Sequence, residues 1–145
     1  MSYEELADRL TYPDDPAAQE LYVQTFEFNP ACTLELGWHL YGENYERGEF
    51  LVRMRGELRR HAIAETTELP DHLTHVLRLI GRMDAGEAAR LAGEAVLPAL
   101  EKIKLPPDSP YVPVLESIRE KLRADFPDAP PRRTELPIFQ EAARG

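Results

Sequence analysis

Two ionisable side chains stand next to each other in the middle of this chain, at Asp71 and His72, and Glu68 precedes His72 by one helical turn. A carboxylate beside an imidazole supports general acid–base chemistry, because histidine titrates near neutral pH and a neighbouring carboxylate stabilises its charged form. The surrounding residues supply no nucleophile within a recognisable motif. A small hydrolase that uses Asp71 and His72 is therefore an alternative that the sequence leaves open, and not its main prediction.

A metal site is the second chemistry that these residues allow. His72 and His75 are three residues apart and share a helix face, and Asp71, Cys32 and His39 are the residues that could complete a ligand set. The chain has neither a paired CxxC nor an HxxxH spacing. The pattern therefore favours a structural or peptide-contacting role for these histidines, and we expect no metal and no cofactor.

The apolar residues that follow this motif have a helical period. From Leu73 to Ile80 they are spaced i, i+3, i+4, i+7, which marks one face of a helix. Pro70 suits the first turn, where its missing N–H is no loss, and the Asp71 carboxylate would face the positive end of the helix macrodipole. We therefore expect His72 at the mouth of this helix, on the protein surface.

The same period recurs along most of the chain, and no segment alternates polar and apolar residues over the length of a strand. Helical stripes run through residues 3–10, 18–25, 34–41, 50–61, 88–103 and 111–122. Pro98 interrupts one of them and is expected to kink that helix or end it early. The sequence predicts an all-α, single-domain helical bundle of about six or seven helices in residues 1–126, followed by an irregular, proline-rich C-terminal tail in residues 127–145.

Four short motifs follow one another along the chain. They are Leu10-Thr11-Tyr12-Pro13-Asp14, Tyr22-Val23-Gln24-Thr25-Phe26, His39-Leu40-Tyr41-Gly42-Glu43 with Arg47-Gly48, and Glu68-Leu69-Pro70-Asp71-His72-Leu73. With these motifs the chain resembles the NarJ/TorD/DmsD group of redox-enzyme maturation chaperones, which includes the delta subunit of respiratory nitrate reductase. The resemblance covers roughly residues 5–105. It departs from the nitrate reductase pattern at Glu43-Asn44-Tyr45-Glu46, so it leaves the client enzyme open.

The resemblance implies a function without catalysis. Chaperones of this group bind the N-terminal or twin-arginine leader segment of the catalytic subunit of a molybdenum-containing oxidoreductase, and they delay membrane docking or export until the cofactor is inserted. Such a chaperone acts as a monomer or homodimer and holds no cofactor itself. A permanent non-catalytic helical subunit of a redox enzyme complex is the alternative. By the motif match, the expected peptide-binding residues are Tyr22, Phe26, His39, Tyr41, Glu43, Glu68, Asp71 and His72.

The charge distribution agrees with a cationic peptide as the partner. The net charge is −9, and residues 1–50 hold 11 acidic against two basic residues, so all of the excess lies in the first third of the chain. Such a field disfavours nucleic acid and accelerates encounter with a basic peptide.

The single cysteine and the acidic N-terminus indicate a cytoplasmic protein without an export signal. No apolar run is long enough for stable membrane insertion.

Overall fold

The structure is a computed structural model that describes residues 1–132, and residues 133–145 lie outside the described part. Within residues 1–132 it contains no β-strand beyond one isolated bridge, between Glu35 and His72. The prediction of an all-α fold is confirmed. No helix in this part of the chain is both long enough and apolar enough to span a membrane. The elements are α1 (Tyr3–Arg9), α2 (Pro16–Phe26), the 3-10 helix η1 (Pro30–Cys32), α3 (Leu36–Tyr41), α4 (Tyr45–Arg60), α5 (Leu73–Arg82), α6 (Ala85–Leu91), the π-helix η2 (Ala92–Val96), α7 (Leu97–Lys102) and α8 (Val112–Asp125).

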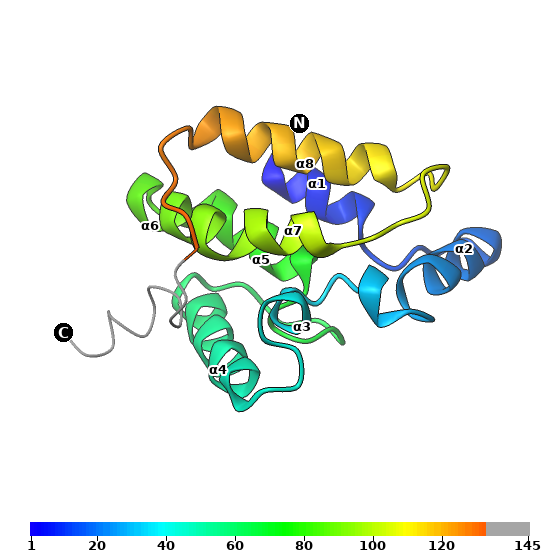
Figure 1. Cartoon of the computed structure of the whole chain (residues 1–145), viewed down its shortest axis with the longest axis horizontal. Helices are drawn as coiled ribbons and strands as arrows, with labels where there is room; N and C mark the ends of the chain where they lie inside the picture. Colours follow the sequence, from blue (N-terminus) through cyan, green and yellow to red (C-terminus); the bar gives the residue numbers. More distant parts are fainter. Residues whose placement is uncertain (133–145) are drawn as a thin grey trace.

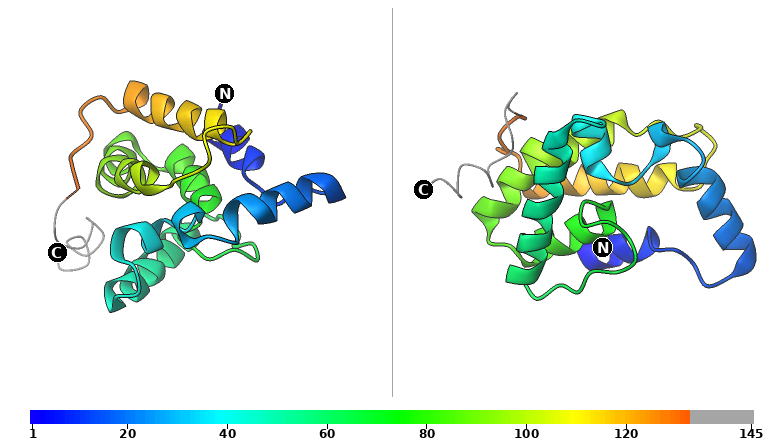
Figure 2. Two further views of the ribbon diagram at one scale, coloured as in Figure 1. Left: turned by 45° about the vertical axis from the view of Figure 1, so that its right-hand side comes forward. Right: turned by 90° about the horizontal axis from the view of Figure 1, so that it is seen from below.

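The helices form a layered bundle from which one helix extends. α8 lies over α1 on one side, the continuous run from α6 to α7 crosses the middle, and α3 and α4 lie on the opposite side (Figure 1). α5 packs against α1 and α4, and α3 contacts both α4 and α7. α2 projects away from this body in all three views (Figures 1 and 2). α2 therefore lies beside the segment that precedes α5, which it contacts through Tyr22.

α5 is the most completely buried α-helix among the described residues. The apolar stripe from Leu73 to Ile80 is buried, as its spacing predicts, and the intervening Thr74, His75 and Leu79 are buried as well. α4 contributes Phe50, one turn from a buried methionine, to the same core. Each fully buried leucine or phenylalanine removes apolar surface worth about 1.5–3 kcal/mol, so α5 anchors the residues that precede it.

The start of α5 differs from the sequence prediction. The helix begins at Leu73 with His72 as its N-cap, and Pro70 and Asp71 precede it. The Asp71 carboxylate accepts a hydrogen bond from the N–H of Gly37 at 2.8 Å, so it faces the first turn of α3 and not the first turn of α5. The local pattern assigns the Asp71 carboxylate to the start of α5, but in the structure it makes a tertiary contact with α3 instead.

Pro98 disturbs its helix in a specific way. α6 continues into α7 through the π-turn of η2, and Pro98 is the second residue of α7. A proline offers no N–H donor, and its ring crowds the carbonyl one turn earlier, so the wider π-turn just before it accommodates the ring without ending the helix. Pro98 does not end the helix, which continues to Lys102, and a π-turn precedes the proline.

Candidate functional site

Backbone hydrogen bonds join the segment before α5 to the segment before α3. The N–H of Leu73 donates to the carbonyl of Leu34 at 2.8 Å, and the N–H of Leu36 donates to the carbonyl of Asp71 at 3.1 Å. These reciprocal bonds fix Asp71 and the residue that follows it relative to α3. The position of the site is therefore set by two segments that lie about 35 residues apart in the sequence.

The Asp71 side chain is fully buried between α3 and α4. Besides its bond to the Gly37 N–H, its Oδ2 lies 3.7 Å from the guanidinium of Arg47, which also binds Glu35 at 2.8 Å. A Cβ on Gly37 would stand 2.6 Å from that oxygen, so the close approach requires glycine. Burial raises the pKa of Asp71, while Arg47 and the Gly37 N–H oppose that rise. Asp71 has no exposed surface for a ligand and acts as a positioning residue for α3.

His72 turns its ring the other way, towards α2. Its Nδ1 accepts a hydrogen bond from the N–H of Thr74 at 3.3 Å, which assigns the ring proton to Nε2. Nε2 lies 3.0 Å from the Glu68 carboxylate and 3.4 Å from the Tyr22 hydroxyl. His72 is 4% exposed, so the expectation that it stands on the open surface is wrong, because Thr74 and Tyr22 contact its ring.

Tyr22, Glu68 and His72 form one hydrogen-bonded cluster. The Tyr22 hydroxyl donates to Glu68 Oε2 at 3.4 Å, so the carboxylate receives two donors. The hydrogen bond from His72 is the main cause that lowers the pKa of Glu68, against partial burial. Burial and the nearby Glu68 raise the pKa of Tyr22, which keeps its hydroxyl protonated. The cluster thus presents an ionised carboxylate held in a fixed position.

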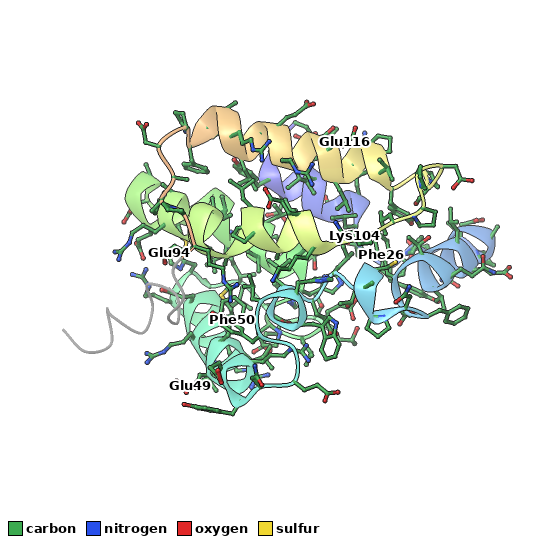
Figure 3. The ribbon with its side chains drawn as sticks, in the orientation of Figure 1. Phe26, Glu49, Phe50, Glu94, Lys104 and Glu116 are labelled. Carbon is green, nitrogen blue, oxygen red and sulfur yellow. The ribbon has the colours of Figure 1, made fainter. Side chains whose placement is uncertain are left out.

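A recess of about 250 Å³ opens above this cluster. Tyr12 packs edge-on against Tyr22 with ring centroids 5.5 Å apart, and Phe26 lies behind Tyr22 at 5.1 Å. Phe26 is labelled on α2 in Figure 3. The recess combines an aromatic wall with polar groups, and its lining residues are Thr11, Tyr12, Tyr22, Glu27, Thr66, Thr67, Glu68, His72, Thr74 and Arg78.

A second hollow of about 360 Å³ adjoins the C-terminal end of α2. Glu27 lines both hollows, and the second one continues past Phe26 and Trp38 to Glu35. The exposed Phe28 follows Glu27 directly in the sequence. Together the two hollows offer an extended surface with aromatic side chains and carboxylates, which suits a peptide segment better than a compact small molecule.

His75 holds the loop that carries Glu68. Its Nδ1 donates to the carbonyl of Leu69 at 2.8 Å, and its Nε2 accepts from the N–H of Thr66 at 3.1 Å. Burial lowers the pKa of His75, so the ring is neutral at neutral pH. Both ring nitrogens are used by the chain itself, and no group of three or more His, Cys, Asp or Glu residues within residues 1–132 has the geometry of a metal site.

The structure separates the eight expected site residues into two groups. Tyr22, Glu68 and His72 line the recess, Phe26 packs behind Tyr22 and lines the second hollow, and Asp71 is buried next to His72 in the chain. The other three lie on α3 or directly after it, outside the lining of the recess: the ring of His39 donates to the Thr33 carbonyl at 2.7 Å, Tyr41 packs on Phe50 with centroids 5.7 Å apart, and Glu43 is exposed.

Several residues that shape the recess were not expected from the sequence. Tyr12 belongs to one of the four sequence motifs, and that motif was the signal that could have identified it. Glu27 and Thr74 lie outside the motifs, so no sequence signal pointed to them. Arg78 stands on the exposed side of α5, where it binds the carboxylates of Glu4 and Asp8 on α1. These positions follow from tertiary packing, which a single local pattern does not encode.

Comparison with known proteins identifies one family. Residues 1–116 match the family model described as nitrate reductase delta subunit. Over 80 residues the chain is 32% identical to the nitrate reductase molybdenum cofactor assembly chaperone NarJ of Escherichia coli strain K12, a match that covers 54% of this chain and 34% of that protein. The same values hold for NarJ of Escherichia coli O157:H7. The chain thus matches about a third of the length of these curated relatives.

Proposed function

The chain belongs to the nitrate reductase delta subunit family, and we propose that it is a maturation chaperone for a molybdenum-containing oxidoreductase. In this proposal it binds the N-terminal or leader segment of the catalytic subunit in the cytoplasm and delays membrane docking or export until the cofactor is inserted. It catalyses no reaction itself. The observation that carries the proposal is the Tyr22–Glu68–His72 cluster at the floor of an aromatic recess.

The charges around the recess favour a cation on the peptide. Glu68 and Glu27 both line it, and the one cation in the lining, Arg78, is already engaged by Glu4 and Asp8. A lysine or arginine side chain that enters the recess would therefore meet a carboxylate whose position is fixed by two hydrogen bonds. Charge-assisted hydrogen bonds of this kind are roughly twice as strong as neutral ones.

The apolar part of the peptide would follow the aromatic side chains. Tyr12 lines the recess, and Phe26 lines the second hollow together with the half-buried Trp38. His39 supports that hollow through its bond to Thr33, which gives it an indirect role in the proposed site. Apolar anchors supply most of the affinity in such grooves, and the carboxylates select the register of the peptide.

Calorimetric titration with a synthetic peptide from the N-terminus of a nitrate reductase catalytic subunit tests this proposal. Glu68→Gln keeps the shape of the side chain and removes its charge, so the affinity is expected to fall by about ten- to hundredfold, as loss of a charge-assisted bond of roughly 1.5–3 kcal/mol implies. Binding to the unsubstituted chain is also expected to weaken at 1 M salt, where the Debye length falls to about 3 Å.

Glu65→Gln is the matched control, because Glu65 lies in the same loop and its carboxylate is bound by Arg55 instead of facing the recess. It is expected to leave peptide affinity unchanged. Equal losses for the two substitutions would reject the recess as the binding site and leave only a general effect of charge.

A further inference from the structure

The C-terminal end of α3 is closed by side chains from distant parts of the chain. A helix leaves its last four carbonyls without partners inside the helix. In α3 two of them accept backbone N–H groups that follow the helix, and the other two accept cations: Lys102 on the carbonyl of His39 at 3.1 Å, and Arg132 on the carbonyl of Leu40 at 2.7 Å. A cation at this end is also favoured by the negative pole of the helix macrodipole.

Arg132 has a second partner at the same place. Its guanidinium lies over the ring of Tyr41, 5.4 Å from the centroid, and that ring packs in turn on Phe50. Burial raises the pKa of Tyr41 to about 12, and the charge of Arg132 opposes that rise. A guanidinium that stacks on an aromatic face and also donates to a carbonyl is recognised through its planar shape, which a lysine ammonium cannot imitate.

The segment that carries Arg132 passes over Gly93, where the absence of a side chain leaves a gap. We call residues 127–132 the strap; it leaves the end of α8, crosses the run from α6 to α7, and heads towards α4 (Figure 1). Figure 3 labels Glu94, next to Gly93, at this crossing. A Cβ on Gly93 would stand 2.0 Å from the carbonyl oxygen of Pro130, and its three nearest atoms would all belong to Pro130.

Within residues 1–132, the strap is attached mainly at Arg132 and at Gly93. Pro127, Asp128 and Pro131 are exposed, and the bond from Arg132 to Leu40 is the one hydrogen bond from the strap to α3 among the described residues. Such a segment buries little apolar surface, so its attachment depends on the arginine and on the close approach at Gly93. Its covalent link to α8 raises its local concentration to roughly the millimolar range.

We propose that the C-terminal end of α3, the ring of Tyr41 and the gap at Gly93 form a docking site for an extended peptide segment with the spacing Pro-x-Arg, and that the strap occupies this site in cis. The site lies apart from the recess and does not depend on the proposed client. A segment of the same chemistry in another polypeptide binds there once the strap is released. The strap is therefore an intramolecular competitor, and it covers Tyr41, which the sequence motifs point to as a ligand contact.

The test uses the full chain, labelled with ¹⁵N, and an unlabelled synthetic peptide with the sequence of residues 127–132, Pro-Asp-Ala-Pro-Pro-Arg. In the unsubstituted chain the strap fills the site, so millimolar peptide is expected to shift few amide signals. Arg132→Glu places a carboxylate against the negative end of α3 and releases the strap. The amides of Leu40, Tyr41 and Gly93 are then expected to shift with added peptide, with an affinity at least tenfold tighter than in the unsubstituted chain.

Two further titrations separate this site from nonspecific binding. Gly93→Ala added to Arg132→Glu fills the gap with a Cβ whose three nearest contacts in the present structure are strap atoms, so the fold is expected to persist and the peptide shifts to disappear. A peptide that ends in Ala in place of Arg is expected to give no shifts. Equal shifts in the chain with and without Arg132→Glu, or shifts that survive Gly93→Ala, would overturn the proposal.

Discussion

The buried carboxylate of Asp71 offers a quantitative test of how the site is held together. Asp71→Ala removes the acceptor for the Gly37 N–H and the partner of Arg47, while Asp71→Asn keeps an acceptor oxygen at the same place and removes only the charge. A buried N–H left without a partner costs about 1–3 kcal/mol. The carboxylate of Asp71 lies 3.7 Å from Arg47, and Arg47 keeps its ion pair with Glu35 in the variant. Loss of the attraction between Asp71 and Arg47 therefore adds less to the cost than loss of the hydrogen bond.

We therefore expect Asp71→Ala to lower the free energy of unfolding by about 2–3 kcal/mol, and Asp71→Asn by about 1 kcal/mol or less. For a chain of this length, 1 kcal/mol corresponds to roughly 3–5 °C in Tm. Urea and thermal unfolding followed by circular dichroism measure both values, with the exposed Asp14→Ala as the control. If the alanine and asparagine variants were equally stable, the hydrogen bond to Gly37 would not be what holds α3 in place.

Two further predictions concern the same region. Gly37→Ala should destabilise the fold by about 1–3 kcal/mol, because its Cβ would stand 2.6 Å from the Asp71 carboxylate, whereas Gly48→Ala in α4 meets no atom within 4 Å and should be neutral or stabilising; chemical unfolding compares the two, and equal effects would refute the close approach. Stability should fall as the pH drops from 7 to 5, because burial lowers the pKa of His75 and of His39 in the folded chain, while the unfolded chain takes up these protons near pH 6.5. The urea midpoint should depend less on pH in the His75→Gln variant than in the unsubstituted chain. An unchanged dependence on pH would show that the pKa of His75 does not differ between the folded and unfolded states.

The helices could be predicted because their apolar residues repeat along the sequence. The stripe of α5 follows from a local rule, and the structure places it as expected. Asp15 and Asp84 are N-caps, a position that aspartate favours for a local reason as well. His72 was expected at the mouth of α5 and is its N-cap, but Pro70 was expected in the first turn and precedes the helix. The Asp71 carboxylate bonds to Gly37, more than 30 residues away in the sequence. A helix-start rule has no access to such a contact.

The candidate site was predictable in part, for the same reason. Tyr22, Glu68 and His72 belong to motifs that the family resemblance brings together, and the structure joins them by hydrogen bonds. His39 lies in a motif as well, but its ring is used by Thr33, a local partner that the motif does not reveal. Glu27 lines both hollows because of the way α2 projects from the bundle. That projection is a property of the whole fold.

The central claim is that the recess beside α2 receives the N-terminal segment of a molybdoenzyme catalytic subunit. A photo-crosslinking amino acid in place of Tyr12, which is 50% exposed at the recess, tests it in cells that express the client, and the same substitution at Tyr45, 77% exposed at the start of α4, serves as the control. We expect mass spectrometry to find adducts from position 12 with the first residues of the catalytic subunit, and none from position 45. Adducts of equal yield from both positions, or adducts from position 12 confined to other parts of the catalytic subunit, would contradict the account.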